Sequence, residues 1–179
     1  MVNSMLHVTM LDFHPQTPTY LLVCAHTWHR TVLDPVNPRL VKERLGADKL
    51  DLILLTTATE QTLAAAEWLH HHTGAPILAG ETLRETGLPV ARYLENGTIV
   101  GLGPLAQTIT LPEGGITCYA MGAENVVFTG PLFATGVARH KANTAAMAAL
   151  ALLPEETHVC GGGAHNLPLK ELLVAVSAS

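Results

Sequence analysis

The stretch that decides the fold is residues 50–79, LDLILLTTATEQTLAAAEWLHHHTGAPILA. Its first six residues form a short, nearly continuous apolar run, which is typical of a strand covered on both faces. A helix with one apolar side follows and ends at Gly74, and residues 76–79 form the next strand. The order strand, helix, strand predicts a crossover between two parallel strands.

Strands are also expected on the N-terminal side of this stretch. They are residues 6–13, 20–24 and 30–33. The last two are predicted to pair as a hairpin. Asn37 is then expected to cap a helix that has Pro38 at its first position and ends at Gly46.

The C-terminal half has a different pattern, with short strands between Gly-, Pro- and Glu-rich turns, which predicts an antiparallel meander. Its strands are residues 98–100, 107–111, 116–120 and 125–129. A helix over 143–153, a strand over 157–160 and a last helix capped by Asn166, with Pro168 near its start, follow. These two halves predict an α+β fold of the α/β type, a four-layer αββα sandwich of two mixed β-sheets in a single domain over residues 1–179.

The composition excludes several classes of function. The 179 residues include 10 Lys or Arg and 15 Asp or Glu, so the net charge of −5 favours neither nucleic acid nor an anionic membrane surface. The longest apolar runs are far shorter than the ~20 residues of a membrane span, and no signal peptide is visible. Three well-separated cysteines fit a reducing compartment without disulfides. We therefore expect a cytoplasmic protein with no nucleic-acid and no membrane partner.

Six segments, in order along the chain, resemble the metallo-β-lactamase-fold superfamily, particularly its glyoxalase II-like hydrolases. They are Val32–Pro35, Leu52–Thr56, Glu67–Ala79, Asn96–Val100, Val126–Gly130 and Leu150–Gly163. In that superfamily the first segment ends in an Asp-Pro turn, the second delivers the metal motif, and the last contains a Gly-His-Gly loop. The similarity spans residues 19–165 and implies the same four-layer fold and a relationship to hydrolases that bind two metal ions.

The metal ligands of that superfamily are replaced in this sequence. Its signature after the second segment is His-x-His-x-Asp-His, whereas residues 57–62 read TATEQT. The positions that match the superfamily's ligands, here called the ligand-equivalent positions, are Thr57, Thr59, Gln61, Thr62, Gly114, Pro131 and Gly162. None is a usual zinc ligand, which would be His, Cys or a carboxylate. The sequence therefore predicts no metal and no cofactor at these positions.

The residues at the start of the second helix have two interpretations. Thr57 and Glu60 are spaced as a capping box, in which each side chain accepts a hydrogen bond from the other residue's amide. Alternatively, Thr57, Thr59, Gln61 and Thr62 at a helix N-terminus could hold a small anion or another polar ligand.

Ten histidines suggest a second metal hypothesis. Those at 70–72 end a helix and point about 100° apart, so they cannot share one ion. His140 and His165 follow loops near the expected cleft, and Cys160 precedes a glycine triplet, so these three are the candidates for residual function. A Cys160–His165 nucleophile pair would need contact and an activating environment, and a buried structural thiol is the alternative.

Three functional hypotheses follow. The first is a non-catalytic pseudoenzyme with a binding, regulatory or assembly role, whose expected partners are a small molecule or anion and a second copy of the chain in a homodimer. The second is an esterase- or thioesterase-like hydrolase that uses a metal-free or relocated site in the family cleft. The third is a structural protein whose cleft is filled by its own side chains.

Overall fold

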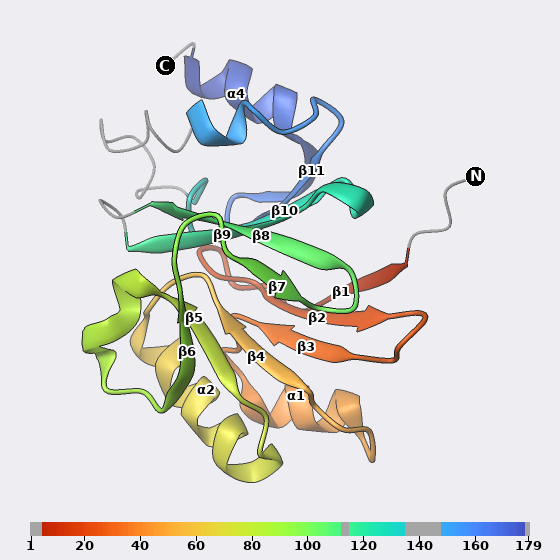
Figure 1. Ribbon diagram of the computed structural model, residues 1–179, viewed down its shortest axis with the longest axis vertical. Coiled ribbons are helices and arrows are strands. Elements are labelled where there is room, and N and C mark those ends of the chain that lie inside the picture. Colours follow the sequence, from red (N-terminus) through yellow and green to blue (C-terminus); the bar gives the residue numbers. More distant parts are fainter. Residues whose placement is uncertain (1–4, 112–114, 135–147, 178–179) are drawn as a thin grey trace.

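The computed structural model describes residues 5–111, 115–134 and 148–177, and its strands form two six-stranded sheets. The sheets pack face to face (Figure 1). Helices α1 (Pro38–Leu45) and α2 (Glu60–Thr73) lie on the outer face of one sheet, and α4 (Leu169–Ser177) lies on the outer face of the other (Figure 1). This arrangement confirms the predicted four-layer αββα sandwich of two mixed sheets.

The first sheet comes from the N-terminal half of the chain. Its strands, in spatial order, are β1 (Leu6–Asp12), β2 (Thr19–Cys24), β3 (Arg30–Leu33), β4 (Leu52–Leu55), β5 (Ile77–Gly80) and β6 (Val90–Leu94). Strands β1 to β3 are antiparallel and β3 to β6 are parallel, which confirms the hairpin and the crossover. Strand β6 was not predicted, because only Leu94 of its five residues is fully buried and the apolar pattern is weak.

The second sheet comes from the C-terminal half. Its strands, in spatial order, are β12 (Ala164–Pro168), β11 (His158–Gly161), β10 (Val126–Gly130), β9 (Ile116–Met121), β8 (Leu105–Leu111) and β7 (Ile99–Gly101). The predicted meander from β7 to β10 is antiparallel, and β10 and β11 are parallel.

The predicted start of the last helix is wrong. Asn166 does not cap a helix but lies within strand β12, where its φ is 54°. Residues 164–168 pair with β11 instead, and the helix begins only at Leu169, whose amide donates to the carbonyl of Thr157 at 2.8 Å. Part of the helix predicted over 143–153 lies outside the described residues. Of the described part, residues 148–150 are helical and residues 151–153 are not.

Buried apolar side chains hold the layers together. Between the sheets, the rings of Tyr20 and Phe128 meet edge to face with centroids 5.5 Å apart, and Leu54 is fully buried beside them in the same cluster. On the outer faces, helix residues Val41, Leu45, Ala66 and Leu69 pack on the first sheet, and Leu169 packs on the second. Each fully buried Leu or Phe stabilises the fold by about 1.5–3 kcal/mol.

The capping box at the start of α2 is displaced from the predicted one. Thr59, not Thr57, is the N-cap, because its hydroxyl accepts from the amide of Thr62 at 3.1 Å while the Thr62 hydroxyl accepts from the amide of Thr59 at 2.9 Å. The Thr57 side chain is buried, and the Thr57 backbone amide is bonded to Asp34. Glu60 is the first helical residue and is exposed.

We predict that Thr59→Ala lowers the free energy of unfolding by about 1 kcal/mol, because it removes the acceptor for the Thr62 amide. Glu60→Ala, the matched control, removes the side chain that the sequence predicted to complete the capping box. It should change the free energy of unfolding by less than about 0.5 kcal/mol. Urea denaturation measures both. Equal losses, or a larger loss for Glu60→Ala, would contradict the observed box.

Candidate functional site

One edge of the sandwich carries the ligand-equivalent positions that the structure describes. There the ends of β3, β4 and β5 meet the ends of β10 and β11 and the start of β9, and we call this region the ligand-equivalent edge. Residues 57–62 lie between β4 and the first turn of α2, Pro131 follows β10, and Gly162 follows β11. Gly114 lies outside the described residues.

A buried carboxylate, Asp34, anchors the loop that carries the first ligand-equivalent positions. Asp34 follows β3 and accepts hydrogen bonds from the Thr56 amide at 2.8 Å and from the Thr56 hydroxyl at 2.5 Å. The Thr57 amide is a further donor to it. Complete burial raises the pKa of Asp34 to about 7, although these three hydrogen bonds favour the charged form and lower it.

The two sheets also contact each other directly at this edge. The amide of Thr117 on β9 donates to the carbonyl of Thr56 at 2.7 Å, and the Tyr119 hydroxyl donates to the carbonyl of Leu55 at 2.7 Å. Glycines allow this close approach, because a Cβ atom at Gly130 would lie 2.0 Å from Oγ1 of Thr56. The loop that holds metal ions in the superfamily is thus tied to the opposite sheet by hydrogen bonds.

The last ligand-equivalent position, Gly162, has no room for a side chain. Its amide donates to the carbonyl of Gly130 at 2.8 Å, and a Cβ atom added to it would lie 2.0 Å from the carbonyl oxygen of Gln16. The connection between β1 and β2 therefore occupies the space into which a residue at position 162 would project. A histidine here would require the backbone near Gln16 to move.

The remaining ligand-equivalent side chains are engaged or face away. Thr59 and Thr62 bond to each other, with their hydroxyl oxygens 3.0 Å apart, and the Thr62 hydroxyl also donates to the Thr59 carbonyl at 3.0 Å. Gln61 is exposed on the first turn of α2, and Pro131 is buried. The structure thus brings the threonines together as a cap and does not bring Gln61 into their hydrogen-bond network.

The residues at this edge do not fit a two-metal centre. Among the described residues of this edge, the candidate ligands are neutral hydroxyls and an amide, and the carboxylate of Asp34 is occupied by amide and hydroxyl donors. Two buried hydroxyls, on Thr117 and Thr129, have no hydrogen-bond partner among the described residues. A hydroxyl is uncharged, however, and lacks the negative charge that an Asp ligand supplies to a metal ion. Within residues 5–111, 115–134 and 148–177, no group of three or more His, Cys, Asp or Glu could hold a metal ion.

Two of the histidines at the end of α2 contact backbone carbonyls of that helix or of the residues just after it. Nδ1 of His70 lies 2.8 Å from the Ala75 carbonyl oxygen, and Nδ1 of His72 lies 2.7 Å from the Trp68 carbonyl oxygen. The His72 ring stacks on Trp68 with centroids 3.7 Å apart. The rings of His70 and His72 therefore contact the C-terminal end of α2, the helix that carries both.

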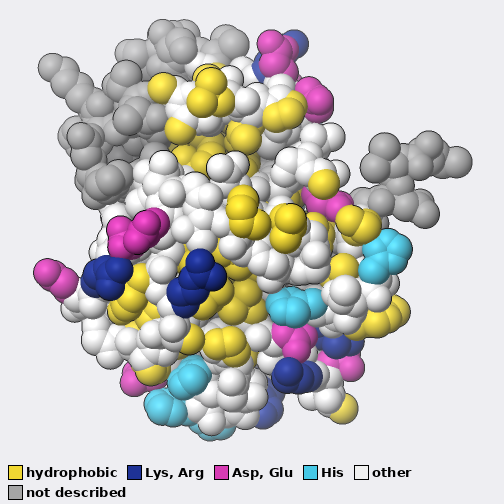
Figure 2. Space-filling model, in the orientation of Figure 1, with side chains coloured by type: hydrophobic (Ala, Val, Ile, Leu, Met, Phe, Trp, Pro, Cys, Tyr) yellow, Lys and Arg dark blue, Asp and Glu magenta, His cyan; other side chains and the backbone are white. Residues whose placement is uncertain are grey.

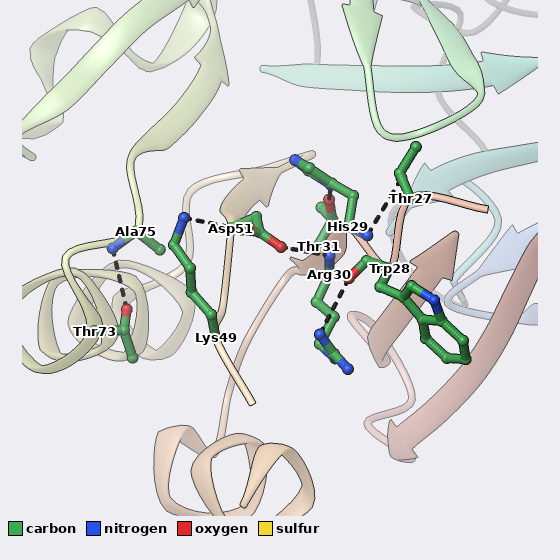
Figure 3. Close-up of polar contacts among 9 residues, drawn as sticks. All are labelled: Thr27, Trp28, His29, Arg30, Thr31, Lys49, Asp51, Thr73 and Ala75. Atoms are coloured by element: carbon green, nitrogen blue, oxygen red, sulfur yellow. Dashed lines mark hydrogen bonds and ion pairs between the residues drawn. The ribbon is translucent and has the colours of Figure 1, made fainter. Parts of the chain in front are cut away.

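At the opposite end of β3 and β4, polar contacts serve structure as well. The carboxylate of Asp51 accepts from the Arg30 amide at 2.9 Å and pairs with Lys49 at 3.1 Å, and Nδ1 of His29 lies 3.3 Å from the Thr31 hydroxyl (Figure 3). These contacts join the start of β3 to the approach to β4. On the face seen in Figure 2, Lys and Arg side chains are spread over the surface and form no basic patch.

Two of the three candidates for residual function are adjacent. Cys160 on β11 and His165 on β12 are paired in register, and Nδ1 of His165 lies 3.1 Å from the hydroxyl of Tyr20. Burial raises the pKa of the Cys160 thiol to about 11, which opposes formation of the nucleophilic thiolate. In the described part of the chain, no hydrogen bond joins the thiol to His165. His140 lies outside the described residues.

Comparison with known proteins confirms the fold. No family model matches the sequence, and no curated protein matches it. The structure resembles that of ETHE1 from Myxococcus xanthus, with 22% identity, a TM-score of 0.68, and coverage of 93% of this chain and 80% of that one. A metallo-β-lactamase from Staphylococcus aureus subsp. aureus COL gives 13% identity and a TM-score of 0.73, with coverage of 98% of this chain and 63% of that one.

A third similar structure is that of TTHA1623 in a di-iron-bound form, with 21% identity, a TM-score of 0.70, and coverage of 96% of this chain and 97% of that one. The chain therefore has the metallo-β-lactamase fold. Sequence reasoning assigned the ligand-equivalent positions from a resemblance and missed the part played by Asp34. The signal was present in the Asp-Pro pair that follows β3.

We predict that stability falls as pH rises, because Asp34 is buried. Between about pH 4 and pH 7 Asp34 is ionised in the unfolded chain and protonated in the native one, so the native state binds more protons. The Asp34 contribution to the free energy of unfolding should therefore fall by about 2–3 kcal/mol from pH 5 to pH 8.

Asp34→Asn is the matched control, because Asn keeps the shape of the side chain and does not titrate. Urea denaturation at both pH values measures the difference. The native chain should lose more stability than the variant, whereas the same pH dependence in both proteins would show that Asp34 does not titrate in this range.

Proposed function

We propose that this chain is a metallo-β-lactamase-fold protein without two-metal catalysis, and that it serves a binding, regulatory or assembly role. The observation that carries the proposal is the ligand-equivalent edge, where hydroxyls, an amide, a proline and a glycine stand in place of metal ligands. Gly162, packed against the Gln16 carbonyl, supports it further, because a backbone segment fills the space of the last ligand.

The chemistry of the fold family depends on metal ions, which activate water and polarise the bond to be cleaved. A protein without them needs another base for the attacking water. Asp34 is a poor candidate, because it is fully buried and accepts hydrogen bonds from Thr56 and Thr57. The contacts at this edge therefore favour a structural role for its polar residues.

The contacts of the threonine cap also indicate where on the molecule a ligand would bind. The hydroxyls of Thr59 and Thr62 bond to each other and cap the helix, which leaves them less able to hold an anion. We therefore favour a ligand-equivalent edge filled by the protein itself, with binding elsewhere on the molecule. Assembly as a homodimer and a cytoplasmic location remain predictions. No helix in the described part of the chain combines the length and apolar character that crossing a bilayer requires.

Metal analysis tests the proposal directly. The protein is expressed with added zinc, iron and manganese, dialysed against EDTA, re-exposed to each metal and desalted. TTHA1623, whose structure is reported in a di-iron-bound form, is the positive control. We expect less than about 0.1 metal ion per chain, because no ligand set fits one. Two tightly held ions per chain would overturn the proposal.

The hydrolase alternative is tested on the same preparations with esterase and thioesterase substrates. Our proposal predicts no activity above that of a buffer blank. Activity that disappears in both Cys160→Ala and His165→Ala would favour the hydrolase, because these two residues are adjacent on β11 and β12.

A further inference from the structure

A cavity of about 310 Å³ lies on one side of the sandwich, away from the ligand-equivalent edge. It opens between β1, the outermost strand of the first sheet, and strands β10 to β12 of the second. Its lining includes Val126 and His158 at the starts of β10 and β11, whereas Pro131 and Gly162 follow the ends of those strands. The cavity is therefore a separate place from the one where the fold family binds its metals.

One wall of this side cavity is apolar and comes from both sheets. Leu6 and Val8 line it from β1, and Val126 lines it from β10. Leu6 and Val126 are buried, whereas Val8 is 37% exposed, as expected for a residue at the mouth. This wall suits a ligand with an apolar body, because its burial removes apolar surface from water on both sides.

The polar part of the side cavity contains a histidine that shares a hydrogen bond with a tyrosine. Nδ1 of His165 lies 3.1 Å from the hydroxyl of Tyr20, and burial raises the pKa of Tyr20 well above its usual value. Tyr20 therefore keeps its proton, and its hydroxyl shares one hydrogen bond with Nδ1 of His165. Nε2, the other ring nitrogen, can hydrogen-bond a ligand as a donor in one tautomer of the neutral ring and as an acceptor in the other.

The charge of the side cavity favours an uncharged ligand over an anionic one. Glu124 lines it, and its carboxylate accepts from the amide of Met5 at 3.1 Å. The lining residues within the described chain include no Lys and no Arg, so a carboxylate or phosphate would face the like charge of Glu124 with only His158 and His165 to offset its own. At about 30 Å³ for each water-sized group, the volume holds about ten non-hydrogen atoms.

We propose that the side cavity binds a small, uncharged, amphipathic alcohol, whose hydroxyl forms a hydrogen bond with His165 and whose apolar body lies on Leu6, Val8 and Val126. The hydroxyl hydrogen has acceptors in the same lining, the side-chain oxygens of Glu124, Asn125 and Asn166. This inference deepens the binding role proposed above and rests on that function, since it names a site and a ligand class for it.

The experiment uses 4-methylphenol, a neutral alcohol of suitable size, as the probe. Toluene lacks the hydroxyl and 4-methylbenzoate replaces it with a charged group, so these two compounds are matched controls. Amide chemical shifts of the full-length ¹⁵N-labelled protein are followed during titration. We expect saturable shifts at the amides of the lining residues with a Kd of about 1 mM or tighter, and at least tenfold weaker binding of both controls.

Three variants test whether the probe binds in the side cavity. Val8→Trp should fill the mouth and weaken 4-methylphenol at least tenfold, whereas Leu105→Trp, on an exposed position of β8 that does not line the cavity, should leave Kd within twofold. His165→Phe keeps a ring beside Tyr20 but removes the ring nitrogen that bonds the ligand, and should reduce the preference for 4-methylphenol over toluene to within threefold. Thermal unfolding of each variant establishes that it is folded.

The inference is overturned if 4-methylphenol causes no saturable shifts up to about 10 mM. It is also overturned if 4-methylbenzoate binds as tightly, or if a folded Val8→Trp variant binds the probe as the native chain does. Metal analysis of the same sample separates the two proposals. Two bound metal ions together with probe binding would contradict the proposed function but support the ligand site in the side cavity. A metal-free protein that does not bind the probe would contradict the ligand site but leave the proposed function standing.

Discussion

The structure of the ligand-equivalent edge depends on the hydrogen bonds of one residue, Thr56, which follows strand β4. Its amide and hydroxyl donate to the buried carboxylate of Asp34, and its carbonyl accepts from Thr117 on the other sheet. Its side chain lies against Gly130, where a Cβ atom would not fit. Thr56 thus joins β3, β4, β9 and β10 at one point. The loop to α2 starts from this junction.

This junction gives the edge a source of order that requires no ion. In a metal protein, coordination fixes ligand loops, and the charges of ion and ligands compensate each other. Here the loop after β4 is fixed by Asp34, by the threonine cap of α2 and by the cross-sheet bond from Thr117. Neutral side chains at the ligand-equivalent positions avoid the unfavourable burial of unpaired charge. The edge is therefore consistent, in chemistry and in packing, with a protein that works without a metal.

The sequence predicted the layers well and the details of the edge poorly, for physical reasons. Buried strands such as β4 and capped helices such as α1 carry local signals, so they were predicted from apolar runs and from capping residues. The contact of Gly162 with Gln16 joins segments far apart in the chain, and no local pattern encodes it. Strand β12 forms a hairpin with its neighbour β11 across Gly162-Gly163, a local turn signal that the sequence reasoning passed over in favour of a helix cap at Asn166. The capping box was predicted two residues too early, because Thr57 has the expected Glu at its third following position, whereas the observed N-cap Thr59 has Thr62 there.

The most direct measurement of the central claim, that the chain's own backbone fills the place of the last metal ligand, is the stability of Gly162→Ala beside Gly101→Ala. A methyl group at position 162 would meet the Gln16 carbonyl, whereas one at position 101 has nothing within 4 Å, and neither glycine has a positive φ. The account predicts that Gly162→Ala lowers the free energy of unfolding by about 2 kcal/mol or more and that Gly101→Ala changes it by less than about 0.5 kcal/mol. Equal stability of the two variants would contradict it.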